Sequence, residues 1–125
     1  MLNRDVSASI RRLAAVLFVV LLASCAGPQI YHGQLGQLDK GLLPSQVISR
    51  LQLEPLSTRT ASGAGRTFEF HQYRMNNGIQ RDVYLLAYED QRLIYWGYIS
   101  EFRRQPDRNL ARALDSVLVE LSLGK

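Results

Sequence analysis

The fold is decided by residues 67–100, TFEFHQYRMNNGIQRDVYLLAYEDQRLIYWGYIS. Three segments rich in apolar and aromatic residues, 67–74, 81–89 and 92–100, are separated by two turn signals. The first signal is Asn77-Gly78, a strong hairpin dipeptide because both residues accept positive φ. The second is the polar stretch 89–91. Short strand-like segments joined by tight turns predict an antiparallel β-meander of three strands.

The second and third of these segments are apolar at both parities. Val83, Leu85 and Ala87 point to one face of a strand, and the apolar residues between them point to the other. A sheet with one wet face alternates more cleanly between apolar and polar residues. We therefore expect both faces of the meander to be covered.

Two short helices are expected before the meander. Leu35, Leu38 and Leu42 recur at helical spacing, and Gly41 is expected to end that turn. Pro44 suits the first position of a second helix, which should end at Glu54-Pro55. The polar stretch 57–66, with glycine, serine and threonine, is expected to be an exposed loop.

A third, amphipathic helix is expected at the C-terminus. Asp107 is a plausible N-cap, and Gly124 is the expected stop. Apolar residues then fall on one helical face: Leu110, Leu114, Val117, Leu118 and Leu121. The predicted fold class is α+β, with two short N-terminal helices packed on a three-stranded antiparallel meander and this helix added. The helix could pack on its own domain or dock on a partner.

The N-terminus has the pattern of an export signal. Arginines precede an apolar run, residues 13–23, that is too short to span a bilayer. Leu22-Ala23-Ser24-Cys25 then resembles the lipobox of bacterial lipoproteins. In those proteins the cysteine is acylated and the signal is cleaved just before it. The resemblance predicts a signal peptide at 1–24, a lipidated Cys25 with a tether at 25–36, and a domain at 37–125.

The composition of the chain argues against several other classes of protein. The chain has 125 residues, one cysteine and two histidines, which excludes a disulfide framework and gives no zinc-site spacing. The formal charge of +4 falls to +2 once residues 1–24 are removed. The sequence contains no basic stretch interleaved with aromatic residues, so it does not predict nucleic-acid binding. We expect no metal and no cofactor.

The segment Lys40-Gly-Leu-Leu-Pro-Ser-Gln-Val47, with Leu51 beyond it, resembles the SmpA/OmlA (BamE-like) family of bacterial outer-membrane lipoproteins. That family has Lys-Gly-Met-Thr-x-x-Gln-Val, then Leu-Gly and a nearby proline. Leu43 and Gln52 depart from the family pattern, which has threonine and glycine there. The resemblance implies two helices on one face of a three-stranded sheet. It also implies a place in the outer-membrane barrel assembly machine, facing the periplasm.

The predicted function is therefore that of a non-catalytic, lipid-anchored outer-membrane protein that docks on a larger envelope complex, with outer-membrane protein assembly the first candidate. Tyrosine, tryptophan and arginine are enriched in binding hot spots. The candidate contact residues are Tyr84, Tyr88, Trp96, Tyr98, Arg103 and Arg104. The competing interpretation is that the aromatic residues fill the core. Alternative functions are a binding or inhibitor module for an exported enzyme, and a pilotin-like module for a secretion pore.

A hydrolase is the remaining alternative. Its candidate groups are His71, Glu69, Asp82 and Ser100. Glu69 and His71 would share one face of a strand. No nucleophile-elbow or metal motif accompanies them, so the sequence does not favour catalysis.

Overall fold

The computed structural model describes residues 28–78 and 81–123. The predicted signal peptide and Cys25 lie outside these residues. The described chain is an α+β domain with nine elements. In order they are β1 (Ile30–Tyr31), the 3₁₀ helix η1 (His32–Gln37), α2 (Pro44–Leu51), β2 (Ser57–Gly63), β3 (Arg66–Asn76), β4 (Arg81–Glu89), β5 (Arg92–Tyr98), α3 (Ile99–Arg103) and α4 (Arg108–Leu123).

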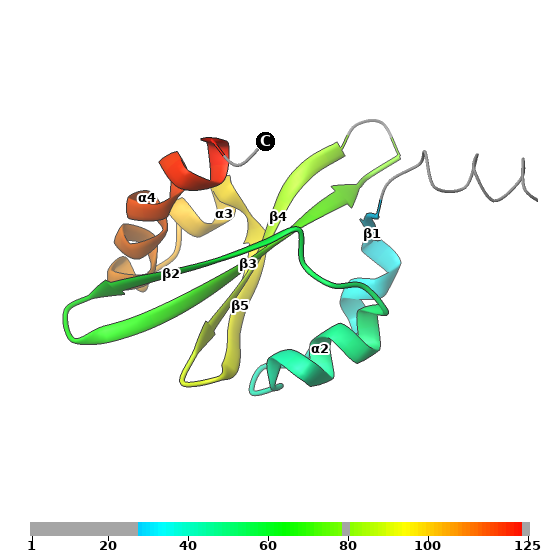
Figure 1. The fold of residues 1–125 in the computed structure, drawn as a ribbon, viewed down its shortest axis with the longest axis horizontal. Helices are drawn as coiled ribbons and strands as arrows, with labels where there is room; N and C mark the ends of the chain where they lie inside the picture. The colour runs from blue at the N-terminus through cyan, green and yellow to red at the C-terminus, as the bar shows by residue number, and fades with distance from the viewer. Residues whose placement is uncertain (1–27, 79–80, 124–125) are drawn as a thin grey trace, which may run out of the picture.

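One mixed sheet forms the centre of the molecule. β3 pairs antiparallel with β4, and β4 pairs antiparallel with β5. On its other side β3 pairs antiparallel with β2 and, near its C-terminal end, in parallel with β1. Figure 1 shows α3 and α4 on one side of this sheet, and α2 with the preceding helical segment on the other.

The two faces of the sheet carry separate apolar cores, so the expectation that both faces are covered is confirmed. The α2-side core contains Tyr73, Tyr84, Leu86 and Tyr88 from the sheet, packed under residues of the segment 30–51. The α4-side core contains alternate residues of the same strands, packed under α3 and α4: Ala61, Phe68, Phe70, Leu85, Ala87, Phe102, Leu110, Ala113, Leu114 and Val117. The two-sided apolar pattern of β4 is explained by this three-layer arrangement.

The prediction of three strands is wrong, because the sheet has five. The stretch 57–66, expected to be a loop, contains β2, whose seven residues pair with β3. Only Ala61 of β2 is buried, so its sequence shows no apolar alternation. The tight turn after β2 contains Ala64 and Gly65, both at positive φ.

The expected tether at 25–36 and the first helix also need correction. Ile30 is fully buried and pairs with Met75, so the fold begins within the segment expected to be a tether. The first helix covers 32–37 and ends before Gly41, the residue expected to end it. Leu42 lies in the chain that follows this helix and is buried. Two backbone hydrogen bonds with Leu93 attach that chain to the outer side of β5.

The later helix boundaries differ by a few residues. α2 ends at Leu51, before the predicted Glu54-Pro55, because Gln52 adopts the left-handed conformation at φ 53°. The C-terminal helix is preceded by the short helix α3. Asp107 Oδ1 accepts a hydrogen bond from the Leu110 N–H at 3.3 Å, as the predicted N-cap requires. Within the described residues no helix has the length and apolar character needed to cross a membrane.

Candidate functional site

A pocket lies where the start of η1, directly after β1, meets β4, β5 and α3. Strand register explains this meeting. β1 pairs with the C-terminal end of β3, beside the β3–β4 turn, and β5 reaches the same end of the sheet because Tyr98 pairs with Tyr84. The pocket is open, with a volume of about 550 Å³, and we call it the sheet-end pocket. Its lining residues are His32, Asn77, Asp82, Val83, Tyr98, Ile99, Ser100 and Arg103.

Tyr98 organises the wall of this pocket. Its hydroxyl lies 2.9 Å from His32 Nε2, and its ring packs edge-on against Tyr84 with centroids 5.0 Å apart. Its backbone N–H donates to Glu101 Oε1 at 3.1 Å, which fixes the start of α3. Burial and the nearby Asp82 and Glu101 raise the pKa of Tyr98. The phenol is therefore protonated at neutral pH and can donate a hydrogen bond.

Charges of both signs lie at the pocket. Asp82 and Arg103 are exposed, while Val83 and Ile99 are half-buried apolar residues. Among the described residues, the Arg103 guanidinium makes a long contact, 4.0 Å, with Asp115, and both side chains are exposed. Such a pair contributes little to stability, so Arg103 can turn to another partner. The arrangement suits recognition of a polar, charged surface.

The six candidate contact residues do not form one surface. Tyr84 and Tyr88 are 4% and 1% exposed and belong to the α2-side core. Trp96 is half-buried against the same core. The core interpretation therefore holds for these aromatic residues, because a small domain needs large side chains in its interior.

Two of the six candidates, Tyr98 and Arg103, meet in the sheet-end pocket, and Arg104 is exposed nearby in sequence. The Arg104 Nε donates to the Ser100 carbonyl at 3.3 Å. The sequence does not single out His32, which lies within the expected tether at 25–36. Its partner Tyr98 is 66 residues away, and no local sequence signal connects the two.

The hydrolase candidates are divided between two places. His71 Nε2 lies 3.5 Å from Glu69 Oε1, so those two share a face as predicted. Asp82 and Ser100 line the sheet-end pocket instead. Asp82 pairs with Met75, four residues along β3 from His71, which separates the two positions by about 13 Å. Residues 28–78 and 81–123 contain no group of three or more His, Cys, Asp or Glu side chains suited to holding a metal ion.

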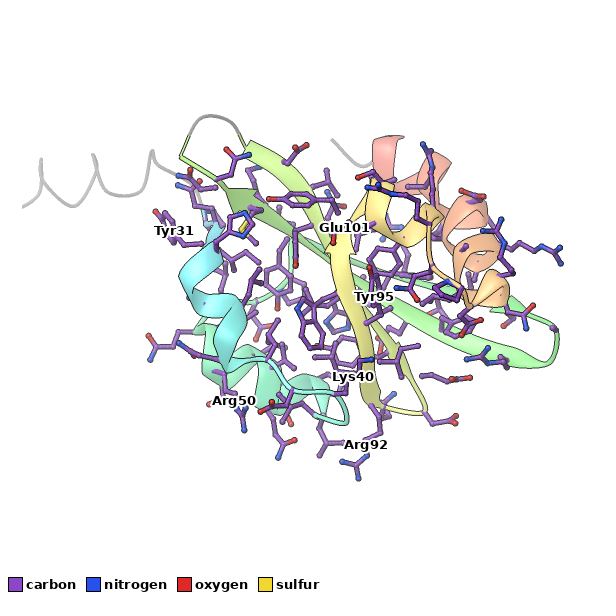
Figure 2. All side chains as sticks on the ribbon, turned by 180° about the vertical axis from the view of Figure 1, so that it is seen from behind. Tyr31, Lys40, Arg50, Arg92, Tyr95 and Glu101 are labelled. Carbon is purple, nitrogen blue, oxygen red and sulfur yellow. The ribbon has the colours of Figure 1, made fainter. Side chains whose placement is uncertain are left out.

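A basic cluster lies at the opposite end of β5. Figure 2 shows Arg50, Lys40 and Arg92 along the lower side of the molecule, with Tyr31 above them. The Arg92 Nη1 donates to the Gly41 carbonyl at 3.1 Å, and Arg50 pairs with Asp39 at 3.1 Å. These exposed cations provide matched control positions for the residues of the sheet-end pocket.

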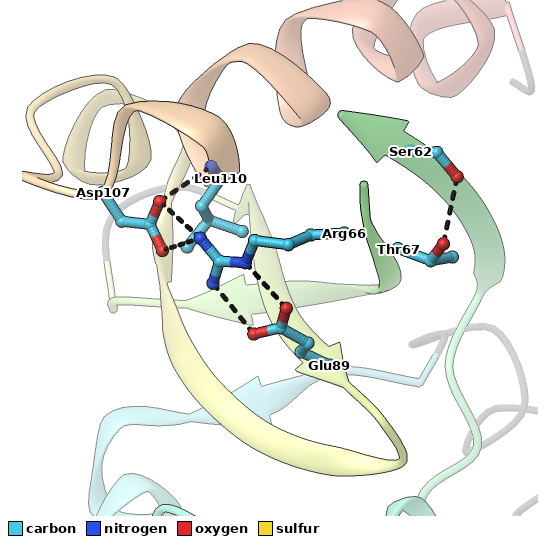
Figure 3. Close-up of polar contacts among 6 residues, drawn as sticks. All are labelled: Ser62, Arg66, Thr67, Glu89, Asp107 and Leu110. Atoms are coloured by element: carbon cyan, nitrogen blue, oxygen red, sulfur yellow. Dashed lines mark hydrogen bonds and ion pairs between the residues drawn. The ribbon is translucent and has the colours of Figure 1, made fainter. Parts of the chain in front are cut away.

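A third polar cluster is structural. Arg66 binds Glu89 through two hydrogen bonds, at 2.7 and 2.8 Å, and reaches Asp107 at 3.0 Å (Figure 3). Because Asp107 also caps α4, this cluster joins β3, β4 and α4. Hydrogen bonding to Arg66 holds the pKa of Glu89 below its ordinary value.

Comparisons with known proteins do not identify a function for these residues. No family model, curated protein or solved structure matches the chain.

Proposed function

We propose that this chain is a non-catalytic lipoprotein, held by an acylated Cys25 on the periplasmic side of the outer membrane, that docks on a larger envelope complex. The observation that carries the proposal is Leu22-Ala23-Ser24-Cys25 at the end of the apolar segment. One acyl chain holds a protein only marginally, whereas two or three give stable anchoring. The first candidate partner is the outer-membrane barrel assembly machine, from the SmpA/OmlA resemblance.

The arrangement of the described residues supports this proposal. η1 and α2 lie on one face of β3, β4 and β5, which is what the resemblance implies. α4 covers the other face and belongs to the domain itself. The apolar residues of α4 are consequently buried within the domain.

The position of the sheet-end pocket also supports docking near the membrane. An acylated Cys25 lies three residues before Pro28, which spans at most about 10 Å of extended chain. Ile30 and His32 follow directly, and His32 lines the pocket. We therefore place the partner contact at the sheet-end pocket, with Tyr98 and Arg103 as its principal residues.

Site-specific photo-crosslinking tests the docking surface in intact cells. A photoreactive amino acid replaces Arg103 in one variant and Arg92, at the other end of β5, in the control. The proposal predicts a crosslinked envelope protein from position 103 and a much weaker product from position 92. A barrel-assembly subunit in the product would identify the partner.

Other outcomes contradict parts of the proposal. A product that contains only a secretion pore subunit or an exported enzyme would replace barrel assembly with the pilotin-like or inhibitor function. Equal crosslinking from positions 103 and 92 would exclude the sheet-end pocket as the contact. The conservative variant Tyr98→Phe, which removes only the hydroxyl, should weaken the product at 103 without unfolding the domain.

A further inference from the structure

β2 is an edge strand of the sheet that lacks the usual protection of an edge. Within the described residues it pairs with β3 and with no other strand, and its register with β3 is continuous from Ser57 to Gly63. An exposed edge presents unpaired backbone N–H and C=O groups, to which another strand can bind. Proteins usually block such an edge with proline, lysine, a bulge or a covering segment. β2 contains no proline or lysine, and its pairing with β3 shows no bulge.

The opposite edge of the sheet, which β5 forms, is blocked by such devices. Two backbone hydrogen bonds join Leu93 to Gly41 and Leu42 on the outer side of β5. The N–H of Tyr98 donates to Glu101 Oε1, and a bulge interrupts the register between β4 and β5. Of these two strands, β2 therefore offers the more open edge to an additional strand.

A polar pocket lies beside β2, on the face of the sheet opposite α4. Strand register explains its composition. Thr60 pairs with Glu69 and Glu69 pairs with Tyr88, so these three side chains form a row across β2, β3 and β4. The pocket has a volume of about 260 Å³, and we call it the β2 pocket. Its lining residues are Thr60, Thr67, Glu69, Tyr88, Asp90 and Gln91.

The β2 pocket is acidic. Its six lining residues include two carboxylates, Glu69 and Asp90, and no cation. Glu69 Oε1 lies 3.5 Å from His71 Nε2, but burial lowers the pKa of His71, so this ring is neutral at pH 7 and does not cancel the charge of Glu69. The hydroxyl of Tyr88 is buried without a hydrogen-bond partner among the described residues. The pocket therefore suits a cationic group that donates hydrogen bonds.

A strand bound to the edge of β2 would bring one of its side chains within reach of this pocket. Neighbouring strands lie about 4.8 Å apart, so a residue opposite Thr60 would lie about 10 Å from the Cα of Glu69. A lysine or arginine side chain extends about 6–7 Å from its Cα and a glutamate side chain about 4 Å, so together they span this distance. A basic residue at this position of the added strand can thus pair with the carboxylates of the pocket.

A second copy of this chain fits the edge less well. β2 paired with β2 of another copy would present Thr58, Thr60 and Ser62 on the side of the pocket, since these alternate residues share that face. None of these side chains carries a positive charge. Arg59, the one charged residue of β2, pairs with Phe70 of the α4-side core and lies on the other face. Charge complementarity therefore favours a segment of a different protein.

We propose that the edge of β2 binds an extended segment of a partner protein by strand addition, and that a lysine or arginine of this segment enters the β2 pocket. Backbone hydrogen bonds to β2 supply the affinity, and ion pairs with Glu69 and Asp90 supply the specificity. This surface is separate from the sheet-end pocket, with which the β2 pocket shares no lining residue. The proposal does not depend on the lipid anchor or on the docking function proposed above.

A peptide titration of the purified full-length chain, followed by NMR, tests this proposal. The probe is a seven-residue peptide of alternating threonine and valine with lysine at its centre, blocked at both ends. The control peptide has glutamate in place of the lysine. The lysine peptide should shift the amide signals of residues 57–63 and leave those of β5 unchanged. The glutamate peptide should bind at least about tenfold more weakly, because like charges would meet in the pocket.

Four variants make the test specific. Glu69→Gln and Asp90→Asn should each weaken binding of the lysine peptide by about twofold to fivefold, the usual effect of one exposed ion pair. Asp90 is exposed, so Asp90→Asn tests the pocket even if Glu69→Gln disturbs the fold. Thr60→Lys places a cation of the chain itself beside the pocket and should abolish the preference for the lysine peptide. Asp115→Asn, at an exposed carboxylate of α4, is the matched control and should bind as wild type does.

Three results would overturn the proposal. The first is an absence of signal changes in residues 57–63 at millimolar concentrations of the lysine peptide. The second is equal binding of the lysine and glutamate peptides to the wild-type chain. The third is a dimer of the chain in sedimentation equilibrium that Thr60→Lys dissociates, since a second copy would then be the occupant of the edge.

Discussion

At the scale of single residues, Gln52 has a strained backbone conformation that glycine would relieve. It follows the last residue of α2 with φ 53° and ψ 37°, the left-handed conformation. Non-glycine residues disfavour this conformation by about 1–2 kcal/mol because Cβ approaches the carbonyl oxygen. Glycine is the common residue at such a helix end.

Gln52→Gly should therefore raise the free energy of unfolding by about 1 kcal/mol, measured by urea denaturation. The control is Ser49→Gly, inside α2, which should lower it by about 0.5–1 kcal/mol. A lower free energy of unfolding in both variants would show that the left-handed position is not strained.

At the scale of elements, the sequence predicts the strands and helices whose buried side chains are apolar. The central strands and α4 carry apolar residues at the spacing of their own structure, so the sequence predicts the correct type for the strands within 67–98 and for the helix at 108–123. Residues 99–100, expected to end the third strand, begin α3 instead. β2 was missed because its residues are polar and its pairing with β3 is made by the backbone. β1 was missed because two residues are too few to show a period. The sheet-end pocket could not be foreseen as a whole, since it brings His32 to Tyr98 through tertiary packing.

The link between elements that Arg66 provides predicts a pH-dependent loss of stability. Replacing Arg66 with Gln leaves Glu89 and Asp107 close together without their cation, so the melting temperature at pH 7 should fall. Because the folded-state pKa of Glu89 is lowered, its stabilising effect is present above the ordinary carboxyl range and is lost as pH falls through the folded-state value.

The difference between wild type and Arg66→Gln should consequently shrink in acid, as thermal melts at pH 7 and pH 3.5 would record. Arg74→Gln, at an exposed position on the same strand, is the control and should change the melting temperature little at either pH. A constant difference across the two pH values would refute the role given to the ion pairs.

α4 makes a second prediction at this scale. Leu114 is fully buried between α4 and the sheet, and removing its side chain to Ala should cost about 2–5 kcal/mol of unfolding free energy. Arg112→Ala, on the exposed side of the same helix, should stay within about 0.5 kcal/mol of wild type. If Leu114→Ala were as stable as wild type, α4 would be a docking element and not part of the core.

At the scale of the whole molecule, the domain is a sheet between two helical layers. The α4 layer is tied to the sheet by its apolar face and, through Asp107, by the Arg66 cluster. The α2 layer packs on the opposite face through Leu38, Leu42, Val47 and Leu51. The chain enters this domain at the sheet-end pocket. The proposed membrane anchor and the proposed contact surface would thus lie at the same end of one small fold.

The central claim is that Cys25 is the acylated first residue of the mature chain. Intact-mass spectrometry of protein extracted from membranes measures this directly. The account predicts a mass equal to residues 25–125 plus a thioether-linked diacylglycerol and an amide-linked acyl chain, and no such species from Cys25→Ala. A membrane-extracted chain with an unmodified Cys25, or one that begins at another residue, would contradict it.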